Sequence, residues 1–170
     1  MRLTGRIRGR VPLLITACAC LAPSALPAEA LGAPSVAIIV NEQNSASDLS
    51  TTEVTQILAL QRQFWKDGRR IVLILPAPGS EARDVILVTI YHRPEDAIRK
   101  EWARKLFAGE IAALPSVAKS AAAAAAIVKQ VPGAIAIVLS TEVQPGVKAL
   151  AIDAKRPGED GYPLAAADTP

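Results

Sequence analysis

The stretch LILPAPGSEARD, residues 73–84, joins an apolar run to a helix start through a proline-rich turn. The leading Leu-Ile-Leu is typical of a buried strand. Pro76 and Pro78 end that strand, because proline has no N–H to donate to a sheet. Ser80 then has the position of a helix N-cap, and Glu81 follows where the helix dipole favours an acid. The stretch therefore predicts a strand, a turn and a helix, which is the unit that α/β domains repeat.

The residues after Ser80 carry two opposing signals. The β-branched run from Val85 to Ile90 favours a strand. The N-cap and the first-turn acids favour a helix, and we expect a helix through EARDVILVTIYHR, residues 81–93.

Similar patterns lie on both sides of this unit. Ser50 and Glu53 have capping-box spacing before an apolar helical face. Pro94 is suited to the first position of a further helix, and Gly109 is suited to the end of that helix. Ser120 would cap a helix of six consecutive alanines. Strands are expected at 36–40, 71–75, 134–139 and 147–152. Strands that alternate with helices predict an α/β domain with buried strands.

The first thirty residues have the order of an export signal. Four arginines are followed by an apolar stretch that is too short to span a membrane, and then by small residues. The expected cleavage follows Ala30, which predicts a periplasmic protein. A competing interpretation is a lipobox at 15–18, in which Cys18 would be lipidated and anchor the chain to a membrane.

Removal of this segment changes the bulk properties. It holds four of the 19 basic residues and one of the 16 acids, so the remaining chain is neutral. A neutral chain gives no support to a nucleic-acid-binding role, which usually requires an excess of basic residues. Both cysteines also lie in the segment, which leaves no thiol chemistry. We expect one domain over 31–153, large enough for its own core, and a Pro/Gly-rich C-terminal tail over 154–170.

No stretch has the spacing of a catalytic or metal site. His92 is the only histidine and has no clustered carboxylates or cysteines around it in the sequence. Trp65 and Trp102 are expected in the core or as turn anchors. The basic residues around Asp67-Gly68 are expected to form a solvated turn. We therefore expect neither enzymatic activity, nor a metal, nor a cofactor.

Several stretches together resemble the phosphate ABC transporter substrate-binding protein family. They are VAIIVN (36–41), LSTTEVTQILALQRQFWKDGRRI (49–71), PGSEAR (78–83), WARKLFAG (102–109), VPGAIAIVLSTEVQPGVKALAID (131–153) and GYPL (161–164). The resemblance implies one lobe of a type 2 periplasmic binding protein-like fold, with a central mixed sheet flanked by helices. In the family, the last segment is where the chain crosses between lobes.

The resemblance also implies a ligand site in the opening stretch. The family has R-x-x-G-S-G-T there, in which side chains and helix-start amides hold phosphate. Gly79 and Ser80 match, but Pro76, Glu81 and Ala82 replace the Arg, the second Gly and the Thr. The Glu81 carboxylate would compete with the anion. Arg83 could supply the missing charge.

Two functions follow from this pattern. The first is a non-enzymatic solute-binding-like domain that takes up phosphate or a similar small oxyanion at 79–83, alone, with an ABC transporter membrane component or with a second copy. The second is a one-lobe envelope scaffold or interaction module that has lost ligand binding. The replacements at Pro76, Glu81 and Ala82 favour the scaffold, whereas Gly79, Ser80 and Arg83 favour binding.

Overall fold

A computed structural model describes residues 34–166 of the chain. The expected export signal, its cleavage site and Cys18 lie outside these residues. The helices are α1 (Thr51–Leu58), α2 (Glu81–Ile86), the π-helix η1 (Leu87–Tyr91), α3 (Glu95–Phe107), α4 (Ala121–Gln130) and the 3-10 helix η2 (Ser140–Glu142). The strands are β1 (Val36–Val40), β2 (Asp48–Leu49), β3 (Val72–Pro76), β4 (Ser116–Ala118), β5 (Ala134–Leu139), β6 (Lys148–Ala149) and β7 (Ala151–Ile152).

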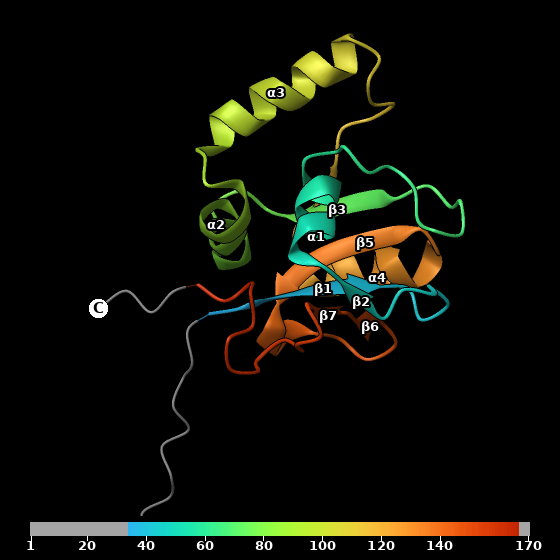
Figure 1. Ribbon diagram of the computed structural model, residues 1–170, viewed down its shortest axis with the longest axis vertical. Coiled ribbons are helices and arrows are strands. Elements are labelled where there is room, and N and C mark those ends of the chain that lie inside the picture. Colours follow the sequence, from blue (N-terminus) through green and yellow to red (C-terminus); the bar gives the residue numbers. More distant parts are fainter. Residues whose placement is uncertain (1–33, 167–170) are drawn as a thin grey trace, which may run out of the picture. The chain divides into compact units, whose positions relative to one another are not determined.

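A five-stranded mixed sheet, with the order β4-β3-β5-β1-β6, forms the centre of the fold (Figure 1). β3 runs parallel to β4 and β5, whereas β1 runs antiparallel to β5 and β6. β2 and β7 form a separate parallel pair. The predicted α/β class with a mixed sheet flanked by helices is confirmed.

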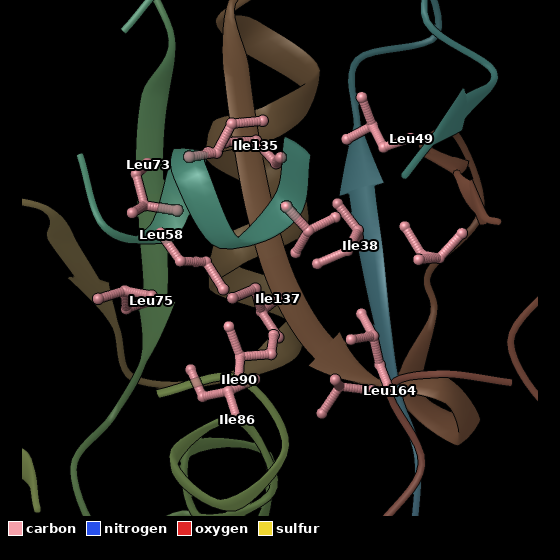
Figure 2. Packing of buried hydrophobic residues seen from close by; sticks show 14 of the residues in the cluster. Ile38, Leu49, Leu58, Leu73, Leu75, Ile86, Ile90, Ile135, Ile137 and Leu164 are labelled. Carbon is pink, nitrogen blue, oxygen red and sulfur yellow. The ribbon is translucent and has the colours of Figure 1, made fainter. Parts of the chain in front are cut away.

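The two faces of the sheet bury side chains of different size. On β1, Val36, Ile38 and Val40 belong to one core cluster, while Ala37 and Ile39 belong to the other, as the alternation of a strand requires. Figure 2 shows the first cluster, in which leucines and isoleucines of the sheet meet those of α1 and the helix from 81 to 91. This face carries most of the large apolar side chains.

The second face packs against α4 through small side chains. Ala134 and Ala136 of β5 face Ala124 and Ala125 of the helix in one cluster. The alanine run of α4 is therefore a helix that approaches the sheet closely, as its small volume predicts.

The helix expected after Ser80 is confirmed, and its β-branched half changes to π geometry. The N–H of His92 donates to the Leu87 carbonyl five residues back, at 2.9 Å. His92 itself is left-handed, with φ +48°, and ends the helix. The first-turn signals thus outweigh the strand propensity of the second half. α3 begins at Glu95, so Pro94 is its N-cap and not its first residue as predicted.

The sequence predicts one continuous strand at 147–152, but the structure has two short strands there. The chain pairs with β1 through β6 and then with β2 through β7. Leu150 lies between the two short strands, fully buried, and its N–H donates to the Ile38 carbonyl at 2.9 Å. The chain therefore changes partner strands at Leu150. The apolar pattern of this stretch does not reveal such a change.

The segment after residue 153, expected as a tail, packs onto the domain as far as the structure describes it. Tyr162 and Leu164 are both buried in the larger core cluster. The Leu164 carbonyl accepts from the N–H of Val36 at 3.0 Å, and the N–H of Ala166 donates to the Pro34 carbonyl at 2.8 Å. The core therefore extends beyond residue 153.

The capping box predicted before α1 is present. The Ser50 side chain accepts from the N–H of Glu53, and the Glu53 carboxylate accepts from the N–H of Ser50 at 3.0 Å. Arg62 Nη1 lies 2.6 Å from the same carboxylate. The Ser50 amide and then Arg62 hold the pKa of Glu53 below its ordinary value.

The lowered pKa of Glu53 predicts a pH-dependent contribution to stability. The ionised carboxylate stabilises the fold above its unfolded pKa, and this stabilisation disappears as the pH falls through the folded pKa. Glu53→Gln keeps the box but removes the charge. We therefore expect its deficit in unfolding free energy, measured by urea unfolding, to be constant near neutral pH and to shrink below about pH 4. A deficit that persists at pH 3 would contradict this cause. Glu42→Gln, at an exposed position, is the control.

Candidate functional site

A cavity of about 350 Å³ lies at one edge of the sheet, where three parallel strands end. Each strand leads into a segment that lines the cavity, and in α/β sheets this edge commonly forms the ligand site. The lining includes Pro76 at the end of β3 with Ser80, Glu81 and Ala82 after it, Lys119, Ser120 and Ala121 after β4, and Leu139 and Glu142 at the end of β5.

The turn between β3 and α2 needs Gly79. Its φ is +74°, a left-handed conformation that side chains with a Cβ rarely adopt. The Ser80 hydroxyl donates to the Ala77 carbonyl at 2.7 Å and accepts from the N–H of Arg83 at 3.3 Å. Ser80 is therefore the predicted N-cap, and its hydroxyl is engaged within its own turn.

Backbone donors are available in the cavity wall. The first N–H groups of a helix have no partner within it. At α2 these groups belong to Glu81 and Ala82, and at α4 to Ala121 and its successor; Glu81, Ala82 and Ala121 all line the cavity. Ser120 caps α4 by accepting from the N–H of Ala123 at 3.2 Å. Two helix starts thus open on one cavity.

The charged side chains of the wall are predominantly acidic. Glu81 and Glu142 are two carboxylates, and Lys119 is the single ammonium among the described lining residues. All three side chains are exposed. A dianion would therefore meet helix-start amides together with a net negative rim. The sequence predicted this opposing charge for Glu81 but not for Glu142.

Arg83 does not line the cavity. It is only 2 % exposed, its Nη2 lies 3.1 Å from Glu95 Oε1, and its guanidinium carbon lies over the Trp102 ring, 5.8 Å from the ring centroid. Its Nε and Nη1 have no hydrogen-bond partner among the described residues. Of the five predicted site residues, the structure thus brings Ser80, Glu81 and Ala82 to the cavity, uses Gly79 for the turn and holds the Arg83 side chain between α2 and α3.

The sequence did not identify the other two sides of the cavity. Lys119 and Ser120 follow the short strand β4, which carries too little apolar pattern to be predicted. Glu142 follows β5 within η2. One signal in the sequence was available. Ser80 and Ser120 both cap a helix that follows a strand, and helix starts that follow parallel strands lie together at the carboxyl ends of those strands.

The two tryptophans and the histidine considered in the sequence lie outside the cavity lining. The Trp65 indole N–H donates to the Gly133 carbonyl at 3.0 Å, and Trp102 packs edge-on against Tyr91. Both are buried, which confirms the prediction that they are core residues or turn anchors. His92 is exposed at the end of η1. Within residues 34–166, no group of three or more His, Cys, Asp or Glu side chains is placed to hold a metal ion, and no helix is long and apolar enough to cross a membrane.

No protein-family model matches the chain, and no curated protein matches it. Solved structures do match. An ABC-type phosphate transport receptor from Vibrio cholerae aligns with a TM-score of 0.63 and 18 % identity over 78 % of this chain and 54 % of its own. A putative phosphate ABC transporter substrate-binding protein with bound phosphate, from Clostridium perfringens, aligns at 0.58 and 19 % over 74 % and 47 %.

PstS from Borrelia burgdorferi aligns with a TM-score of 0.58 and 14 % identity over 74 % of this chain and 50 % of its own. The chain thus spans about half the length of the solved structures that it matches. At identities of 14 to 19 %, the comparison shows a shared fold. The domain has the fold of phosphate-binding proteins of ABC transporters, over about half of their length.

Proposed function

We propose that this domain is an exported, periplasmic, non-enzymatic solute-binding module that takes a small oxyanion, phosphate foremost, in the cavity at the ends of β3, β4 and β5. The observation that carries the proposal is the convergence of two helix starts on one cavity at this edge of the sheet. Amides at helix starts favour negative charge. The similar Clostridium perfringens structure is described with bound phosphate.

In this proposal Gly79 shapes the turn, and the amides of Glu81 and Ala82 contact the anion. The Ser80 hydroxyl reaches the anion by leaving the Ala77 carbonyl. Arg83 takes part only when its pair with Glu95 opens. Binding is expected to be weak, because the carboxylates of Glu81 and Glu142 oppose the anion and the described residues leave the cavity open. A transporter membrane component or a second copy would complete the site.

Thermal unfolding of the chain with phosphate, sulfate or chloride at equal ionic strength tests the proposal. Phosphate at 100 times its Kd should stabilise the fold by about 2.7 kcal/mol. For a domain of this size the unfolding midpoint would rise by about 5 to 10 °C. A rise with phosphate no larger than with chloride would refute oxyanion binding and favour the scaffold function.

Glu81→Gly is expected to tighten phosphate binding. Removing one carboxylate about 4 Å from an anion relieves about 1 kcal/mol of repulsion in water, which is about a fivefold lower Kd. The same change removes a first-turn acid from α2, so the unliganded protein should lose a few tenths of a kcal/mol in stability. Isothermal titration calorimetry measures the affinity. Glu42→Gly, at an exposed position outside the cavity lining, is the matched control, and an unchanged affinity in Glu81→Gly would contradict the competition argument.

A further inference from the structure

The outer face of α3 is unpartnered in the described part of the chain. The opposite face packs Ile98, Trp102 and Lys105 toward the domain. Figure 1 shows α3 at the periphery of the fold, beyond α2 and away from the sheet. On the outer face, Asp96, Lys100, Ala103 and Phe107 follow one another at helical spacing and form a single stripe.

A groove of about 450 Å³ runs along this stripe. Its lining comprises Asp96, Arg99, Lys100, Trp102 and Ala103 of α3 and Leu114 of the segment that returns toward β4. Leu114 is 49 % exposed, and Phe107, one helical turn beyond Ala103 on the same stripe, is 90 % exposed. Single exposed apolar residues are common, but an exposed leucine in the groove together with an exposed phenylalanine one turn farther along the same helix face is typical of a contact surface.

The charge of the groove indicates what it can accept. Lys100 pairs with Asp96 at 3.4 Å, whereas Arg99 forms no ion pair among residues 34–166. The rim is therefore cationic, with two basic side chains against one acid. Complementary potentials guide protein recognition, so the apolar floor and cationic rim together fit an acidic amphipathic segment.

Two other occupants fit the surface less well. In an antiparallel pair of α3 helices from two copies, Arg99 and Lys100 of both copies would meet near the centre of the stripe and repel one another. A membrane would contact the exposed Phe107 and the basic residues, but a flat lipid surface leaves a concave groove unfilled. A protein segment can enter the groove.

We propose that this groove docks an acidic amphipathic helical segment of a partner protein. Apolar side chains of the partner lie over Ala103 and against Leu114, and its carboxylates face Arg99 and Lys100. Phe107 contacts the segment at its end. This mode is the insertion of a helix into a groove, with apolar anchors at every third or fourth residue. The site is separate from the cavity at the sheet edge and does not depend on oxyanion binding.

Two fluorescein-labelled peptides of about 14 residues, or four helical turns, test the proposal with the full chain. Both carry Leu at i, i+3, i+4 and i+7, and one has Glu and the other Lys at the remaining positions. Fluorescence anisotropy should show binding of the Glu peptide only. Phe107→Ala should weaken it about tenfold, and Arg99→Glu should shift the preference toward the Lys peptide. Val88→Ala, which removes another exposed apolar side chain outside this groove, should leave the affinity unchanged.

Several results would overturn the proposal. Equal binding of the two peptides, or binding that Phe107→Ala leaves intact, would show that the groove does not select the segment. Sedimentation of the protein as a dimer that Arg99→Glu alters would assign the face to a second copy. Phe107-dependent binding to phosphatidylglycerol vesicles without peptide binding would assign it to a lipid surface. Because Phe107 is almost fully exposed, its alanine variant should fold; Leu114→Ser is a second variant for the same groove.

Discussion

Glu95→Gln is expected to lower the free energy of unfolding by about 3 kcal/mol. The change leaves Arg83 charged, buried and without its ionic partner, because Glu95 supplies the only carboxylate that pairs with it among the described residues. Removing one member of a buried pair is strongly destabilising for this reason. The value lies at the lower end of the usual range, because the Glu95 side chain is still 23 % exposed. Urea unfolding at neutral pH measures the loss.

Asp96→Asn provides a matched control on the next residue of α3. Asp96 pairs with Lys100, but both side chains are largely exposed, so this pair should contribute less than about 0.5 kcal/mol. Equal losses in the two variants would show that burial of Arg83 is not the cause. The Glu95 variant also tests the site, because a freed Arg83 that reaches the cavity would tighten phosphate binding, whereas a purely structural Arg83 would leave the affinity unchanged.

Leu164→Ala is expected to cost about 3 kcal/mol. Leu164 is fully buried in the larger core cluster, and truncating a buried leucine loses transfer free energy and leaves a cavity. Figure 2 shows its side chain in the same cluster as Ile38 of β1. The loss should appear in the urea midpoint with an unchanged slope, since the folded state stays compact.

The control for this variant is Leu114→Ala, at a position that is 49 % exposed. It should cost well under 1 kcal/mol. If Leu164→Ala were equally mild, the segment after residue 153 would be an appendage, as the sequence suggested, and not part of the core. A large loss would mean that any shortened form of the domain has to retain this segment.

Local signals predicted much of this fold. The capping box at Ser50, the N-cap at Ser80, the glycine turn at Gly68 and the buried strand at 36–40 all depend on residues near one another in the chain. Their patterns specify helix starts, turns and buried strands without reference to distant contacts. The resemblance to phosphate-binding proteins is likewise supported by the fold comparison.

Contacts between residues far apart in the chain could not be predicted from such local signals. Arg83 lies in a helix start that suits an anion, yet its side chain pairs with Glu95, twelve residues later and in another helix. β4 is three residues long and is stabilised by its pairing with β3. Nothing in the apolar run at 147–152 marks Leu150 as the point where the chain changes partner strands. Glu142 reaches the cavity because β5 ends beside β3.

The pairing of residues 34–36 with 164–166 has a consequence for how the domain can be joined to others. Residues 34–36 and 164–166 therefore lie side by side, and Ser35 lies next to the cavity edge, because its carbonyl accepts from the N–H of Ser140 at 2.9 Å, one residue beyond Leu139. A partner protein fused to residue 34 and to residue 166 through two short flexible linkers would be held beside the cavity. Its effective concentration there would be in the millimolar range. Under that arrangement a contact with a Kd of about 100 μM, too weak to persist between separate proteins at micromolar concentration, would be occupied most of the time.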